Sequence, residues 1–121
     1  MSTYINPNAI ADNSITKNKL GIGNDELSAY PLVNHGTNDT TFTLTPNTFH
    51  VWGTVSSLTL TFGDTLNDII NEYTFQFTSN ANTTLILPNV IKWANDMVPT
   101  IVENKTYVVS VINNLAVFTE F

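Results

Sequence analysis

The clearest pattern of hydrophobic and polar positions lies in the C-terminal part of the chain. Tyr73, Phe75 and Phe77 are large aromatic residues that alternate with Thr or Gln. A period of two is expected for a β-strand with one buried face and one solvated face. This pattern predicts a strand over residues 73–78, with its aromatic side chains in the core.

A β-hairpin is predicted at the end of the chain. The runs 106–112 and 115–121 are rich in β-branched and aromatic residues, and only Asn113 and Asn114 separate them. Asn tolerates the positive φ that the favoured two-residue turns require, so this spacing is typical of a tight hairpin.

Both faces of the first hairpin run are largely apolar. Val108 and Ile112 share one face, and Tyr107, Val109 and Val111 share the other. We therefore expect burial on two sides, either within a sandwich or against another subunit. The residues expected in the subunit core or interface are Tyr107, Val109, Val111, Leu115, Val117 and Phe121.

The middle of the chain predicts further short strands separated by turns. These strands are expected at residues 40–45, 49–52, 56–62, 83–87 and 90–93. Gly63 ends the third of them, and residues 64–71 form either a helical turn or a loop. Short strands with turn signals every 8–12 residues or so indicate an all-β fold, an antiparallel β-sandwich or jelly-roll-like domain.

The first thirty residues have a different pattern. Large aliphatic residues recur every five positions among Asn, Asp, Ser, Thr and Lys, at Ile5, Ile10, Ile15 and Leu20. Five fits neither the helical nor the strand period, so this segment needs an external surface to bury its apolar side chains. We expect residues 1–30 to form an extended attachment stem and residues 31–121 to form a head domain. The alternative is a disordered polar tail.

Composition and charge exclude several classes of function. The chain has 121 residues, no Cys, 42% hydrophobic and 12% charged residues, and a formal net charge of −6. All four basic residues are Lys, so bidentate phosphate recognition by Arg is excluded and nucleic-acid binding is not expected. The longest apolar runs are too short to span a membrane, and no apolar secretion segment opens the chain. We expect a soluble, mildly acidic protein that does not insert into membranes.

No residue pattern predicts catalysis, a cofactor or a metal. His35 is expected in a loop and His50 in a strand, where it is more often a structural residue than a base. Asp64, Asp68 and Glu72 would share one helical face, but they lack the spacing of a calcium loop. These acids are interpreted as a solvated edge, and the protein as a non-enzyme without cofactors.

Two tryptophans are candidates for a ligand platform. Trp52 and Trp93 together could stack against a sugar ring, although a buried Trp that anchors a sandwich core is the more common use.

Several segments of the C-terminal part carry a resemblance. They are Asn71-Glu72-Tyr73-Thr74-Phe75-Gln76-Phe77-Thr78-Ser79, then Leu85-Ile86-Leu87-Pro88 with Ile91-Lys92-Trp93, then Glu103-Asn104-Lys105-Thr106-Tyr107 and Ile112-Asn113-Asn114-Leu115. In this order they are similar to a module of structural proteins of tailed bacteriophages. The resemblance covers about the last 70 residues, from Trp52 onward. Ala9-Ile10-Ala11-Asp12-Asn13-Ser14-Ile15-Thr16 resembles repeats at the attachment ends of phage fibres.

The resemblance implies a virion component with a trimeric β-rich domain on a thin N-terminal stem. The expected function is that of a head fibre, tail fibre or other capsid decoration, anchored to a capsid, tail or baseplate protein. Its expected location is the exterior of the phage particle, after synthesis in the bacterial cytoplasm. The alternative function is a module that binds a glycan or receptor on the host surface. A depolymerase is disfavoured, because no motif places a carboxylate pair in a groove.

Overall fold

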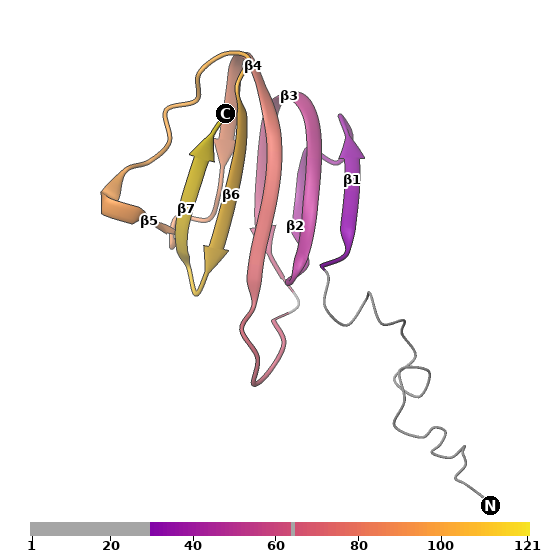
Figure 1. Cartoon of the computed structure of the whole chain (residues 1–121), viewed down its shortest axis with the longest axis vertical. Helices are drawn as coiled ribbons and strands as arrows, with labels where there is room; N and C mark the ends of the chain where they lie inside the picture. Colours follow the sequence, from indigo (N-terminus) through magenta and orange to yellow (C-terminus); the bar gives the residue numbers. More distant parts are fainter. Residues whose placement is uncertain (1–29, 64) are drawn as a thin grey trace, which may run out of the picture. The chain divides into compact units, whose positions relative to one another are not determined.

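The computed structural model describes residues 30–63 and 65–121, so the expected stem residues Ile5, Ile10, Ile15 and Leu20 lie outside the described residues. The regular secondary structure of the described residues is almost entirely β-strand, which confirms the all-β prediction (Figure 1). Its elements are β1 Leu32–Gly36, β2 Thr41–Leu44, β3 Thr48–Phe62, β4 Glu72–Ile86, β5 Lys92–Trp93, the 3₁₀ turn η1 Ala94–Asp96, β6 Thr106–Ile112 and β7 Leu115–Glu120.

All seven strands belong to one mixed sheet. The strand order is β1-β3-β4-β6-β7-β5, with β2 also paired to β3. The expected antiparallel arrangement is wrong for most of it, because β3 pairs in parallel with β1, β2 and β4, and β5 pairs in parallel with β7. Only β4 with β6 and β6 with β7 are antiparallel.

The long strands β3 and β4 bend, and this bend explains the parallel pairing. Each has 15 residues, which would span about 50 Å if fully extended. Thr48 at the start of β3 pairs with Tyr73, whose hydroxyl group reaches the carbonyl oxygen of Gly63 just beyond the end of β3. The two ends of β3 therefore lie close together, and Figure 1 shows β3 arching over at the top of the sheet.

The bend removes the need for long crossover connections. Parallel neighbours usually need a connection of a dozen or more residues. Here β1 pairs with the first half of β3 and β2 with its second half, so β1 and β2 together follow the same path as β3. The path of β1 and β2 bends back toward its start, so β2 ends near the place where β3 begins. Residues 45–47 are therefore enough to join β2 to β3.

Residues 79–83 mark the bend in β4. A turn was expected between two separate strands here, whereas the strand assignment continues and the register with β3 shifts instead. The Thr83 hydroxyl group donates to the carbonyl oxygen of Val55 at 2.6 Å and also receives the backbone N–H of Asn80 at 2.8 Å. These contacts satisfy backbone groups that the shifted ladder leaves unpaired.

The core lies between the two halves of the bent sheet. The alternation expected for Tyr73, Phe75 and Phe77 is confirmed, since all three are buried and the residues between them are half-buried. The strand over residues 56–62 also alternates as expected, with its Leu side chains buried. The buried apolar residues are Leu44, Trp52, Val55, Leu58, Leu60, Tyr73, Phe75, Phe77, Tyr107, Val109, Val111 and Ala116.

The predicted C-terminal hairpin is confirmed. β6 and β7 pair from Tyr107 with Glu120 to Ile112 with Leu115. Asn113 and Asn114 form the turn with φ values of 55° and 64°, the left-handed conformation that two-residue hairpin turns require.

Two other local predictions need correction. Leu32–Gly36 is a strand, although no strand was predicted before residue 40. Residues 65–71 form a loop, which excludes the helical alternative for this described stretch. Asn71 braces this loop by accepting the N–H of Leu66 and donating to the carbonyl oxygens of Leu66 and Ile69.

Candidate functional site

One exposed feature of the described residues is the side of β1, β3, β4, β6 and β7 that points away from the core. One row of side chains across it runs from Leu32 through Phe49, Thr74 and Ser110 to Val117. We call this surface the outer sheet face. It consists of Leu32, Asn34, Phe49, Val51, Glu72, Thr74, Gln76, Thr78, Thr106, Val108, Ser110, Ile112, Leu115, Val117, Thr119 and Phe121.

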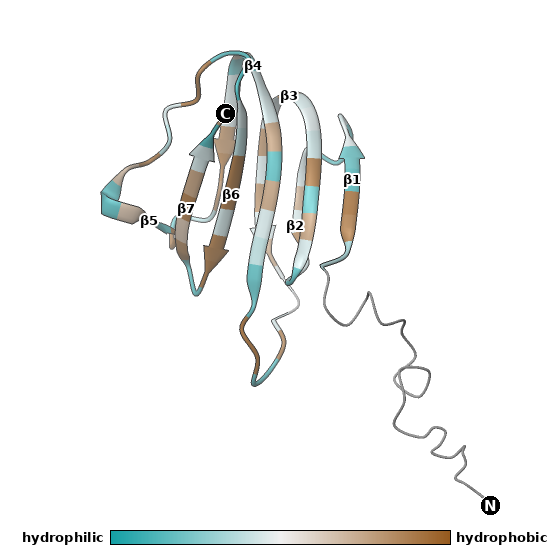
Figure 2. Ribbon diagram, viewed as in Figure 1, coloured by the Kyte–Doolittle hydropathy of each residue, from teal (hydrophilic) through white to brown (hydrophobic). Residues whose placement is uncertain are grey.

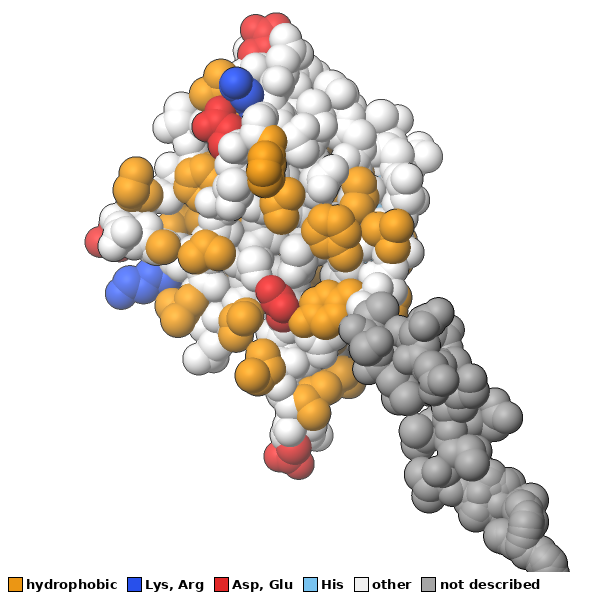
Figure 3. Space-filling model, viewed as in Figure 1, with side chains coloured by type: hydrophobic (Ala, Val, Ile, Leu, Met, Phe, Trp, Pro, Cys, Tyr) orange, Lys and Arg blue, Asp and Glu red, His pale blue; other side chains and the backbone are white. Residues whose placement is uncertain are grey.

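Apolar side chains occupy about half of the outer sheet face. Ile112, Leu115, Val117 and Phe121 are 42%, 58%, 55% and 70% exposed. Figure 2 shows hydrophobic bands along β6 and β7, and Figure 3 shows hydrophobic side chains spread over the side turned to the viewer. Glu72 is the only charged member of the set, so an apolar partner would meet little charge here.

Four polar side chains of the outer sheet face bind one another across strands. The hydroxyl groups of Thr78 and Thr106 lie 3.1 Å apart, and the Ser110 hydroxyl group donates to the Glu72 carboxylate. Covering polar groups that already have partners costs less free energy than covering free ones. These four side chains can therefore lose their water at a small cost.

The six hairpin residues expected in the core or interface separate into two groups. Tyr107, Val109 and Val111 lie in the core. Leu115, Val117 and Phe121 lie on the exposed face instead. The expected burial of the hairpin on two sides is not seen, since this sheet packs on itself from one side only. Alternation along the strand predicts two apolar faces, but it cannot say which one the same chain covers.

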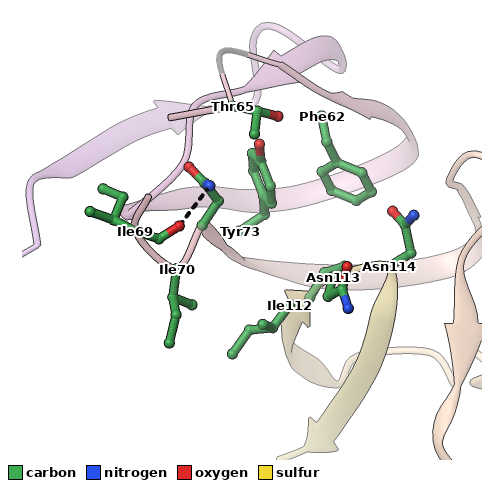
Figure 4. Close-up of a pocket in the computed structure, with 10 residues that line it drawn as sticks. Phe62, Thr65, Ile69, Ile70, Tyr73, Ile112, Asn113 and Asn114 are labelled. Atoms are coloured by element: carbon green, nitrogen blue, oxygen red, sulfur yellow. Dashed lines mark hydrogen bonds between the residues drawn. The ribbon is translucent and has the colours of Figure 1, made fainter. Parts of the chain in front are cut away.

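A second candidate site is a pocket of about 600 Å³ between the 65–71 loop and the hairpin turn, which we call the loop–hairpin pocket (Figure 4). It is lined by Phe62, Thr65, Ile69, Ile70, Asn71, Tyr73, Val111, Ile112, Asn113 and Asn114. The rings of Phe62 and Tyr73 lie side by side, with centroids 4.9 Å apart. None of the lining residues carries a formal charge.

The polar groups of the loop–hairpin pocket differ in their availability. The Tyr73 hydroxyl group is bound to Gly63, and the Asn71 amide braces the loop. The side-chain amides of Asn113 and Asn114 make no hydrogen bond to another described residue, and Figure 4 shows both beside the opening. The pocket therefore combines an aromatic wall with two free amides.

The two tryptophans do not form a joint platform. Trp52 is buried, and its indole N–H donates to the carbonyl oxygen of Asn38 at 2.8 Å, so the platform interpretation is wrong for this residue. Trp93 is half-buried and packs edge-on against Phe118 with ring centroids 6.0 Å apart. It lines a smaller pocket of about 370 Å³ with Leu85, Ile86, Leu87, Pro88, Asn89, Ile91, Val98, Pro99 and Ile101.

The sequence analysis missed a buried pair of histidines. His35 lies in β1, not in a loop, and its Nε2 atom is 3.0 Å from Nδ1 of His50 in β3. The His35 Nδ1 atom is 3.1 Å from a carboxylate oxygen of Asp39, and the His50 Nε2 atom is 3.1 Å from the Thr45 hydroxyl group. No signal in the sequence points to this contact, because it depends on β1 and β3 pairing in parallel.

The acidic residues considered as a cation site do not share a helix. Asp64 lies outside the described residues, Asp68 is in the loop, and Glu72 belongs to β4. Among residues 30–63 and 65–121, no group of three or more His, Asp or Glu side chains is arranged to hold a metal ion. Within the same stretches, no helix has the length and apolar character needed to cross a membrane.

A scan against protein-family models, a search of curated proteins and a search of solved structures found no match to this chain.

Proposed function

We propose that this chain is a structural subunit of a tailed-bacteriophage particle. In this proposal it is a fibre or decoration subunit that forms a homotrimer through the outer sheet face. The observation that carries it is the outer sheet face itself, with exposed apolar side chains and two cross-strand hydrogen bonds between its polar side chains. The sequence resemblance supplies the particle and the three-fold symmetry.

The physical argument concerns the apolar side chains on β6 and β7. Leu115, Val117 and Phe121 remain mostly in water in a single chain. Fully burying a large apolar side chain contributes about 1.5–3 kcal/mol, so three per subunit provide a substantial driving force for association. Monomers rarely expose a large contiguous apolar patch unless it has a partner.

The proposal also assigns a role to residues 1–30. They act as the stem that anchors the subunit to a capsid, tail or baseplate protein, so that the head projects from the exterior of the particle. No enzymatic step, cofactor, nucleic acid or membrane insertion belongs to this role.

The test compares the mass of two surface variants in solution. Val117→Lys places a charge on the outer sheet face, whereas Thr84→Lys places the same charge on an exposed position in the second half of β4. Size-exclusion chromatography with light scattering should give a trimer for the parent and Thr84→Lys and a monomer for Val117→Lys. A monomeric parent at micromolar concentration would overturn the proposed assembly.

A second candidate function rests on the loop–hairpin pocket. A neutral sugar offers hydroxyl groups to amides and an apolar ring face to aromatic side chains, and the pocket presents both kinds of partner without charge. In this alternative the subunit recognises a neutral glycan on the host surface.

Glycine variants separate this alternative from a purely structural role. Asn113→Gly and Asn114→Gly remove an amide yet keep a residue that adopts positive φ, so the turn persists. Binding of neutral oligosaccharides should shift the NMR signals of the pocket in the parent and weaken in both variants. Unchanged spectra of the parent at millimolar oligosaccharide would exclude this function.

A further inference from the structure

The buried histidine pair joins the first strand to the rest of the sheet. Among the described strands, β1 lies at the end of the strand order and pairs only with β3. The His35 side chain is 3% exposed, and its ring stacks on Trp52 with centroids 4.2 Å apart. Phe42 from β2 contacts the same ring at 4.6 Å. The imidazole of His35 is thus the main side chain that β1 inserts into the core.

The hydrogen bonds around the pair determine where its protons lie. Asp39 accepts a hydrogen bond from the Nδ1–H of His35, so in the neutral ring Nε2 of His35 is an acceptor. Nδ1 of His50 then donates to it, which leaves Nε2 of His50 to accept from Thr45. The backbone N–H of Thr45 also points at this atom at 3.4 Å, in agreement with its being unprotonated.

One added proton can be accommodated, but a second cannot. A proton on His35 Nε2 reverses its hydrogen bond, so that His35 donates to His50 and His50 donates to the Thr45 hydroxyl group. The backbone N–H of Thr45 then loses Nε2 of His50 as its acceptor. Protonation of both rings would place two N–H groups against each other across a gap of 3.0 Å and two positive charges in a site shielded from water.

Among the described residues, Asp39 is the only charged side chain bound to the pair, and one carboxylate cannot offset two positive charges. Three other side chains contact the pair, and none of them titrates. They are Phe42 in β2, Thr45 directly after β2, and Trp52 in β3. Asp39 lies in the turn after β1, and its side chain is 56% exposed. Burial, and then the nearby His35, lower the pKa of His50 below its usual 6.5.

We propose that the His35–His50 pair is an acid-sensitive latch that holds β1 and the turn after it against β3, and that its second protonation releases them. The hairpin of β6 and β7 stays folded, because β4 lies between it and β3, the strand that carries His50. This inference is independent of the proposed function.

Hydrogen exchange on the full chain between pH 7.5 and 5.0 tests the latch. After correction for the pH dependence of chemical exchange, protection of β1 should fall by up to about tenfold per pH unit below pH 6.5, because release takes up one proton. At pH 5.0 the amides of β1 should exchange almost without protection, whereas residues 107–111 in the hairpin should stay strongly protected. The same level of protection in both regions at pH 5.0, or no loss in β1, would overturn the proposal.

A variant and a direct titration complete the test. In His50→Asn the amide nitrogen can replace Nδ1 as donor to His35 without titrating, so the loss of protection in β1 should disappear. The chain has only two histidines, so imidazole ¹⁵N signals of the parent protein report on this pair alone. Two separate protonation steps, the second coinciding with loss of β1 amide signals, would support the latch even if His50→Asn did not fold. A single shared step near pH 6.5 with intact β1 signals would refute it.

Discussion

The hydroxyl group of Tyr73 donates a hydrogen bond of 2.9 Å to the carbonyl oxygen of Gly63. These residues bracket the loop between β3 and β4, and Tyr73 also pairs with Thr48 at the start of β3. One side chain therefore holds the end of β3 beside its beginning. This contact supports the bend that lets both halves of the sheet share one core.

Removing this hydroxyl group should weaken the contact that holds the end of β3 beside its beginning. Tyr73→Phe keeps the ring against Phe62 but leaves the Gly63 carbonyl oxygen without this donor. The free energy of unfolding should fall by about 0.5–1.5 kcal/mol, the usual net value of one hydrogen bond. Urea denaturation measures the change, and an unaltered midpoint would show that the hydroxyl group does not support the bend.

The two faces of the hairpin should respond differently to charge. Val109→Asp and Val111→Asp each place a carboxylate in the core, and each should cost several kcal/mol, enough to unfold a marginally stable domain. Val117→Asp is the matched control, because this side chain is 55% exposed in a single chain. It should retain the circular dichroism spectrum of a folded protein. A normal melting temperature for both core variants would contradict the assignment of the buried face.

The turn at Asn113 and Asn114 should discriminate between Ala and Gly. Both residues have positive φ, which costs an ordinary L-residue about 1–2 kcal/mol but costs Gly almost nothing. Asn114→Ala should therefore lower the melting temperature, whereas Asn114→Gly should not. If both variants melted alike, the conformation of the turn would not contribute to stability.

The overall stability should decrease as the pH falls below about 6.5. Burial and the neighbouring His35 lower the pKa of His50 in the folded state, so the unfolded chain binds more protons at mildly acidic pH. The contribution of neutral His50 is complete above the unfolded-state pKa and is lost as the pH falls through the folded-state value. Denaturant titrations at pH 7.5, 6.5 and 5.5 measure this trend. A constant free energy of unfolding over that range would contradict it.

The head and the predicted stem should be separable. A chain that begins near Tyr30 keeps every described strand, so it should fold and form trimers yet fail to join the particle. Replacing Ile10 and Ile15 with Ser in the full chain should reduce attachment without changing the melting temperature of the head. If the shortened chain decorated particles at the parental level, the head itself would be the docking element.

Local features of the sequence were sufficient to predict the strands that alternate regularly. Such patterns determine the conformation of only a few neighbouring residues. Examples are the alternation at Tyr73, Phe75 and Phe77 and the turn residues Asn113 and Asn114. A period of two orients side chains, and an Asn pair selects a turn, whatever the rest of the chain does. The all-β class and the C-terminal hairpin follow from such local rules.

Only the tertiary structure decided how the strands combine. Alternation is the same in parallel and antiparallel strands, so it could not reveal that β3 and β4 bend and pair in parallel. It likewise could not show that Val109 is covered by the chain itself while Val117 is left exposed. The contact between His35 and His50 arises from the register of β1 on β3, a long-range pairing that neither residue encodes in its own neighbourhood.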